Sequence, residues 1–220
     1  MAVKQKCISS DLLKNCPVTD LMKGPSREIA NSQFTTFNLK EEMADNDILE
    51  KLQPYFDCVL SVDDKEKILE LHERFKNDLL IQKVNLDGVE LIVKPYPYNR
   101  SHKDGLPKWF DGLLEKFVHV ITRDAKEDKR KISKKIREFR SERALRIHWI
   151  KPILENASDR RITRFRYTEN SNREREYFWY RAKGYMVIVE YINPNFSLIT
   201  GFCVDQSNQA YYMRKLRNKT

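Results

Sequence analysis

The chain has 220 residues, of which 40% are hydrophobic and 33% are charged, and its formal net charge is +9. Eleven Phe, ten Tyr and three Trp exclude a disordered chain, and six Gly and eight Pro are too few for a fibrous or linker-dominated protein. No apolar run approaches the roughly 18–20 residues of a membrane span, and the amino-terminal segment lacks the apolar core of a signal peptide. We therefore expect a cytoplasmic protein that does not bind membranes.

The sequence shows no sign of a metal or a cofactor. Its cysteines are scattered and form no CxxC pair, which fits a reducing compartment and argues against structural zinc: Cys7, Cys16, Cys58 and Cys203. The phosphate-binding, dinucleotide-binding, zinc-protease and serine-hydrolase motifs are absent. The histidines are too dispersed to suggest a metal site: His72, His102, His119 and His148. We expect no metal site and no cofactor.

Positive charge is concentrated in the carboxy-terminal half. Residues 1–125 hold 18 basic and 21 acidic residues, whereas residues 126–220 hold 23 and 11, so the net charges are −3 and +12. The densest stretch runs from Lys126 to Arg146, with ten basic and four acidic residues. A solvated helix face explains such a stretch in many proteins. The asymmetry also indicates a polyanionic partner, either nucleic acid or an acidic protein.

The first half of the chain predicts an arm followed by a small helical region. Residues 1–40 contain few periodic apolar positions and predict a poorly ordered arm with one short helix near residues 10–22. Residues 41–110 predict helices, one of them starting at Asp63-Asp64. In the same region, Asp87-Gly88 lies between two apolar runs and predicts a β-hairpin.

Residues 126–151 predict one long basic helix. Its apolar seam consists of Ile132, Ile136, Phe139, Ile147 and Ile150, together with Arg143. A guanidinium on a buried seam needs a carboxylate, backbone carbonyls or a ligand phosphate as its partner. An internal salt bridge from Arg143 to Glu176 or Glu190 and a phosphate contact both satisfy this requirement. Pro152 is expected to break or kink the helix.

The last seventy residues predict a β-sheet. Four runs rich in aromatic and β-branched residues are separated by short turn sequences: RITRFRYT, REYFWYRA, YMVIVEYI and FSLITGFCV. Connections this short allow only antiparallel neighbours. The expected fold is therefore α+β, with the long helix packed on a four-stranded antiparallel meander over residues 113–220. A short basic tail is expected to follow the last strand.

The basic half contains the side chains that RNA cleavage without a metal needs. A general base takes the proton of the 2′-hydroxyl, an acid protonates the leaving oxygen, and cations stabilise the phosphorane. His119, in the run VHVITR, is the best proton carrier, although a structural role explains it equally well. Arg143 is the first choice for phosphate, followed by Arg140 and Arg146. The expected catalytic residues are His119, Arg143, Arg146, Thr200 and Tyr211.

Other basic residues are expected to contact the nucleic-acid backbone, although a solvent-facing position explains each of them as well. These residues are Arg123, Lys134, Lys135, Arg137, Arg140, Arg164 and Arg166.

Several segments of the basic half together resemble a known group of nucleases. FVHVITR, a basic segment, RSERALRIHWIKPILEN, REYFWY, YMVIVEY and SLITGF follow one another in the order seen in the barnase–EndoU–colicin–RelE (BECR) ribonuclease group. The resemblance covers about residues 113–215. It implies a helix before a four-stranded antiparallel sheet, with the active site on the sheet face, and a metal-independent ribonuclease of the bacterial or phage toxin and effector type. His119, Arg143, Arg146, Thr200 and Tyr211 match the positions of its site.

The sequence therefore predicts a metal-independent ribonuclease that cleaves RNA by 2′-hydroxyl transesterification. An antitoxin-like inhibitor or another acidic protein is the expected protein partner. The alternatives are a non-catalytic module that binds nucleic acid or protein, and a phage or host-defence regulator that blocks a nucleic-acid enzyme.

Overall fold

The computed structural model describes residues 47–125 and 136–219, and all structural statements below refer to these residues. Its helices are α2 (Lys65–Lys76), α3 (Ser101–Asp104), α4 (Glu115–Ile121), α5 (Ser141–Ala144), α6 (Ile150–Glu155) and α7 (Gln206–Arg217). Its strands are β1 (Val84–Leu86), β2 (Val89–Ile92), β3 (Thr122–Asp124), β4 (Arg137–Phe139), β5 (Ile162–Thr168), β6 (Glu174–Tyr180), β7 (Tyr185–Ile192) and β8 (Asn195–Cys203). Single turns of π-helix (Asn77–Ile81) and of 3-10 helix (Lys108–Phe110, Ile147–Trp149 and Arg181–Lys183) complete the elements.

Six strands form one mixed sheet in the order β1-β2-β8-β7-β6-β5, and β3 and β4 form a separate two-stranded sheet. Strands β5 to β8 pair antiparallel in chain order, as their short connections predict. Strand β2 pairs in parallel with β8, but only at Phe196 and Ser197. The rest of that edge of β8 lies beside α4 and α5, where Lys116 Nζ donates to the carbonyl of Ile199 over 3.3 Å.

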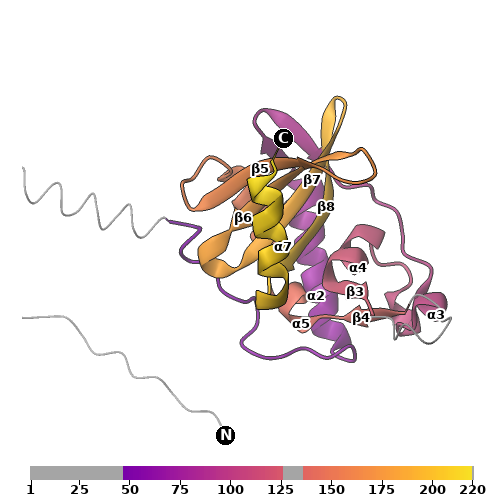
Figure 1. Ribbon diagram of the computed structural model, residues 1–220. Helices are drawn as coiled ribbons and strands as arrows, with labels where there is room; N and C mark the ends of the chain where they lie inside the picture. Colours follow the sequence, from indigo (N-terminus) through magenta and orange to yellow (C-terminus); the bar gives the residue numbers. More distant parts are fainter. Residues whose placement is uncertain (1–46, 126–135, 220) are drawn as a thin grey trace, which may run out of the picture. The chain divides into compact units, whose positions relative to one another are not determined.

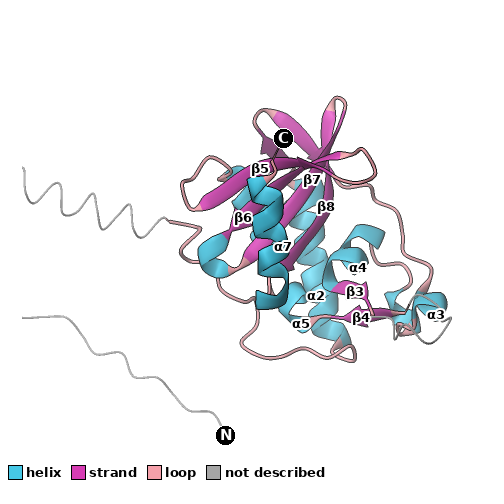
Figure 2. Cartoon of the chain, viewed as in Figure 1, coloured by secondary structure: helices cyan, strands magenta, loops and turns pink. Residues whose placement is uncertain are grey.

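The large sheet is covered on both faces (Figures 1 and 2). On one face, Phe178, Val187 and Leu198 belong to a core that also includes buried residues of α2, α4 and α6. On the other face, a smaller apolar cluster is covered by side chains of α7. That cluster consists of Phe165, Tyr177, Trp179, Met186, Ile188 and Phe202. Strands β6 and β7 are buried on both faces because helices pack against both.

The predicted architecture of a long helix on a four-stranded meander is wrong. The described part of residues 126–151 begins with strand β4, and Arg140 has an extended backbone (φ −128°, ψ 102°) that separates β4 from α5. Pairing with β3 gives the Arg137–Phe139 backbone its hydrogen-bond partners, and the predicted seam residue Ile136 is 47% exposed. Pro152 lies in the first turn of α6, where its missing N–H costs no hydrogen bond.

The sheet and the carboxy terminus also differ from the prediction. The hairpin β1-β2 extends the meander to six strands and adds one parallel pairing. The predicted basic tail is the twelve-residue helix α7, whose side chains Tyr212, Met213 and Leu216 pack on the sheet. Asp205 caps this helix by accepting from the N–H of Asn208.

Two local predictions for the first half are confirmed. Helix α2 starts directly after Asp63-Asp64, and Asp87-Gly88 forms the turn between β1 and β2. Gly88 has φ +80° and Asp87 has φ +54°, the left-handed conformations that such a two-residue turn requires. The predicted arm over residues 1–40, together with its short helix, lies outside the described residues, and so do Ile132, Lys134 and Lys135.

None of the helices in the described residues combines the length and the apolar character that crossing a membrane requires.

We predict that Gly201→Ala destabilises the protein by about 1–3 kcal/mol, the usual cost of overpacking a core. A Cβ at this position would lie 2.8 Å from Tyr185 Oη and 3.0 Å from Ile150 Cδ1. Denaturant unfolding of the variant measures the loss.

The matched test is Tyr185→Phe. Tyr185 Oη is buried and has no hydrogen-bond partner in the described residues, so its removal alone should leave stability unchanged or raise it. In the double variant the loss caused by Gly201→Ala should shrink, because the closest contact of the added Cβ, with Tyr185 Oη, has gone. Additive effects of the two substitutions would contradict this account of the packing.

Candidate functional site

A cleft of about 600 Å³ opens on the sheet face that α7 covers only in part. Strands β7 and β8 contribute lining residues that we call its floor, α7 contributes those of one wall, and α4, β3, β4 and α5 contribute those of the other wall. Five cationic and three acidic side chains line it: Arg123, Arg137, Arg143, Arg175 and Lys215, and Asp124, Glu169 and Asp205. The cleft is therefore positively charged and open to an extended anion.

His119 lies on α4, at the wall of the cleft, with its side chain exposed. Its Nδ1 is 3.5 Å from Nη2 of Arg137, which also donates to the backbone carbonyl of His119 over 3.3 Å. The pKa of His119 is lowered, first by desolvation of the charged ring, which the solvent access of this exposed residue limits, and then by the charges of Lys116 and Arg137. The imidazole is therefore neutral at pH 7 and can accept a proton.

Arg143 lies half-buried in the same cleft with few partners for its charge. One of its five N–H groups donates to the carbonyl of Thr122 over 3.1 Å, and the guanidinium lies 5.4 Å from the centre of the Phe202 ring. Within the described residues it forms no ion pair with a carboxylate: Glu176 pairs with Arg164, and Glu190 pairs with Arg173 and Arg175. Desolvation lowers the pKa of Arg143. An anion in the cleft would supply the missing partner.

Arg123 and Arg137 continue the positive wall on the paired strands β3 and β4. Arg123 is half-buried and has neither an ion pair nor a hydrogen bond from its side chain in the described residues. Arg137 is held in place, because its Nε donates to Thr122 Oγ1 over 2.7 Å and its Nη1 lies 3.3 Å from Asp124. The short strand pair thus fixes one arginine and leaves the other available to a ligand.

The floor and the α7 wall contain two more of the residues expected from the sequence. Thr200 lies half-buried on β8, directly opposite Ile188 of β7. Tyr211 is on the second turn of α7 and is 44% exposed. The ammonium group of Lys215 lies 4.9 Å from the centre of the Tyr211 ring. The structure therefore places His119 and Arg143 in one cleft with Thr200 and Tyr211.

Beyond Tyr211, the cleft ends in a buried charged group that the sequence analysis missed. Lys215 Nζ donates to Glu169 over 2.6 Å and to Tyr177 Oη over 2.9 Å, and Tyr177 also donates to Glu169. Burial disfavours the charged form of Lys215, but these hydrogen bonds outweigh it and raise its pKa. Desolvation, assisted by Glu169, raises the pKa of Tyr177. Lys215 therefore contributes a fixed positive charge, and only recognition of α7 as a helix could have revealed this group.

Arg146 and Arg140 are not among the residues that line the cleft. Arg146 donates to the carbonyl of Glu142 over 3.0 Å and packs 5.3 Å from the centre of the Trp149 ring. Arg140 lies within ion-pair distance of Glu138 and Glu142. Neither guanidinium joins His119, so both are left out of the site.

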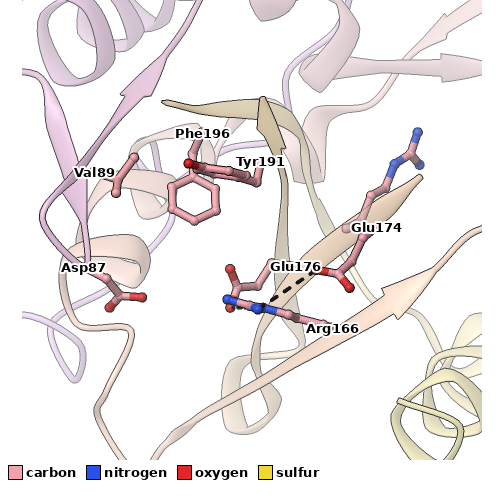
Figure 3. Close-up of a pocket in the computed structure, with 8 residues that line it drawn as sticks. Asp87, Val89, Arg166, Glu174, Glu176, Tyr191 and Phe196 are labelled. Carbon is pink, nitrogen blue, oxygen red and sulfur yellow. Dashed lines mark ion pairs between the residues drawn. The ribbon is translucent and has the colours of Figure 1, made fainter. Parts of the chain in front are cut away.

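Arg164 and Arg166 lie on the opposite face of the sheet, where Arg166 lines a cavity of about 320 Å³ (Figure 3). Their Nε atoms lie 2.5 Å and 3.5 Å from the buried carboxylate of Glu176, and Arg164 also pairs with Asp87. Tyr191 and Phe196 form the apolar side of this cavity. Carboxylates neutralise both arginines. This face therefore has less uncompensated positive charge to bind a polyanion than the cleft has.

Within the described residues, no group of three or more His, Cys, Asp or Glu side chains is arranged to hold a metal ion. The chain matches no protein-family model, and comparisons with the curated proteins and with the solved structures find no similar protein. The interpretation of the site therefore depends on its own geometry.

We predict that inorganic phosphate raises the pKa of His119 from its low value, because an anion between the guanidinium groups offsets their effect on the imidazolium. Arg143→Gln should raise the pKa without phosphate, since it removes one positive charge, and should weaken the response to phosphate. NMR titration of the imidazole measures both effects.

Arg166→Gln is the matched control, because this arginine lies on the other face and should change neither value. An unchanged His119 pKa in saturating phosphate would show that the cleft does not hold anions.

Proposed function

We propose that the cleft binds the sugar–phosphate backbone of RNA and cleaves it by 2′-hydroxyl transesterification without a metal. The observation that carries the proposal is that one cleft holds both a neutral His119 and the half-buried Arg143 guanidinium, which has no carboxylate partner in the described residues. The sequence resemblance to the BECR ribonuclease group implies the same activity, and four of its five matched positions line the cleft, namely His119, Arg143, Thr200 and Tyr211, whereas Arg146 does not.

In the proposed reaction His119 accepts the proton of the 2′-hydroxyl. The 2′-oxygen then forms a bond to phosphorus as the bond to the 5′-oxygen breaks, leaving a 2′,3′-cyclic phosphate and a 5′-hydroxyl. Arg143 and Arg123 stabilise the charge on the non-bridging oxygens. Thr200 orients the phosphate from the floor, and the exposed hydroxyl of Tyr211 donates a proton to the leaving oxygen. A bound phosphate raises the basicity of His119 by offsetting the neighbouring cations.

A non-catalytic module that binds nucleic acid is the second candidate. The observation that favours it is the uncompensated positive charge of Arg123 and Arg143 in the cleft, because these cations are sufficient to bind a phosphate backbone without any proton transfer. In that case the same cations bind the backbone and no bond is broken. The two candidates therefore differ in whether the RNA is cut: the ribonuclease releases fragments, and the binding module leaves the RNA intact.

We predict that the purified protein cleaves RNA in the presence of EDTA and leaves DNA intact, because DNA lacks the 2′-hydroxyl nucleophile. The products should carry 2′,3′-cyclic phosphates. His119→Ala should lower kcat/KM by about 100-fold or more, the usual effect of losing a general base. Electrophoresis and mass spectrometry of the fragments measure these outcomes.

Arg143→Gln should also lower kcat/KM, whereas the control Arg166→Gln should not. Intact RNA that nevertheless binds with an affinity that falls steeply with salt would support the binding module instead. Cleavage that survives His119→Ala would indicate contamination or a different site.

A further inference from the structure

A second pocket, of about 310 Å³, adjoins the cleft at His119 and Arg137, which line both cavities. The loop containing Lys94, Tyr96 and Tyr98, the start of α4, and the hairpin between β7 and β8 form its walls. Its polar lining includes Lys94, Arg100, Lys116 and Ser197, and its apolar lining includes Tyr96 and Ile192. A ligand that extends past His119 from the cleft therefore enters this adjoining pocket.

The charges of the adjoining pocket also favour an anionic ligand. Glu115 is the only carboxylate among its lining residues, and it pairs with Arg100 over 2.6 Å. Lys94 forms no ion pair within the described residues, and Lys116 donates only to a backbone carbonyl. Desolvation lowers the pKa of Lys116. The positive lining is therefore only partly neutralised.

Tyr96 presents an exposed aromatic ring from a firmly held backbone. Its side chain is 56% exposed, whereas its carbonyl accepts from the N–H of Glu115 over 2.8 Å. The next residues are fixed as well, because the N–H of Tyr98 donates to Leu113 over 2.7 Å and the Tyr98 side chain is buried. Because this backbone is ordered before binding, stacking of a planar group on the ring costs entropy only in the Tyr96 side chain.

We propose that the adjoining pocket holds the base of the nucleotide next to the scissile phosphate, stacked on Tyr96. The inference rests on the proposed function and specifies its substrate as single-stranded RNA, because a base in a duplex cannot leave its stack to enter the pocket without an added cost. Stacking on an aromatic ring tolerates every base, so Tyr96 contributes affinity with little sequence preference. Lys94 and Lys116 line the same pocket and supply positive charge for the adjacent phosphate of the strand.

The test is the binding of a fluorescent 2′-O-methyl RNA tetranucleotide, which cannot be cleaved, measured by anisotropy. Tyr96→Ala should weaken binding about tenfold, the typical loss of one stacked base, and Tyr96→Trp should restore it. Tyr191→Ala is the matched control, because Tyr191 is similarly exposed (53%) but lines the cavity on the other face. An analogue without the base next to the central phosphate should bind to the Tyr96→Ala variant and the native protein equally.

These outcomes separate the inference from the proposed function. Binding that depends on Tyr96, without cleavage of natural RNA, would uphold the pocket and overturn the ribonuclease. Cleavage of RNA together with equal tetranucleotide affinity for the native protein and Tyr96→Ala would overturn the base pocket alone. Absence of any binding would overturn both and would leave an acidic protein as the occupant of this surface.

Discussion

Burial of the central strands on both faces is the constraint on which the rest of the structure depends. Strands β6 and β7 present large apolar side chains on alternate positions to both sides, so the sheet needs two covering layers. Helices α2, α4 and α6 cover one side, and α7 covers part of the other. The cleft lies beside α7, where Thr200 is only partly covered, so the site follows from the packing of a short helix on a wide sheet.

The same arrangement explains the electrostatics of the cleft. Beyond Ser197, the edge of β8 that faces β2 pairs with no strand of the described residues, and α4 and α5 lie against it. These short elements bring His119, Arg143 and the β3-β4 pair to one wall of the cleft. On the opposite face of the sheet, Glu176 neutralises Arg164 and Arg166, whereas no carboxylate neutralises Arg143 within the described residues. The two faces therefore differ in their capacity to bind an anion, although both are rich in arginine.

Patterns local to a segment were predictable from the sequence, and those that depend on distant partners were not. Alternation of aromatic and β-branched residues identified β5 to β8, and Asp87-Gly88 identified the hairpin. The apolar spacing around Phe139 and Arg143 predicted a helix, but β4 pairs with β3, and Arg137 of β4 donates to Thr122, which lies fifteen residues earlier in the chain. This tertiary pairing overrides the local helical spacing. Helix α7 was missed because lysine and arginine interrupt its short apolar stripe, although Asp205 was available as a capping signal.

In the candidate site, too, the residue types could be recognised in the sequence, whereas the contacts between distant residues could not. The residue types of His119, Arg143, Thr200 and Tyr211 suggested chemistry, and the structure places them around one cleft. Arg146 ranked after Arg143 as a phosphate ligand in the sequence, and in the structure it lies beyond α5, at the start of the 3-10 turn Ile147–Trp149, where it packs on Trp149 instead. The charged group of Lys215 and Glu169 joins residues 46 positions apart and left no local pattern to detect.

The central claim is that a phosphate occupies the cleft beside His119 and pairs with Arg143. A crystal structure of the protein with a 2′-O-methyl RNA dinucleotide tests it most directly. We predict a phosphate oxygen within hydrogen-bond distance of the Arg143 guanidinium and the sugar of the preceding nucleotide beside the His119 imidazole. A dinucleotide bound at Arg164 and Arg166, or a cleft that stays empty at saturating ligand, would contradict the account.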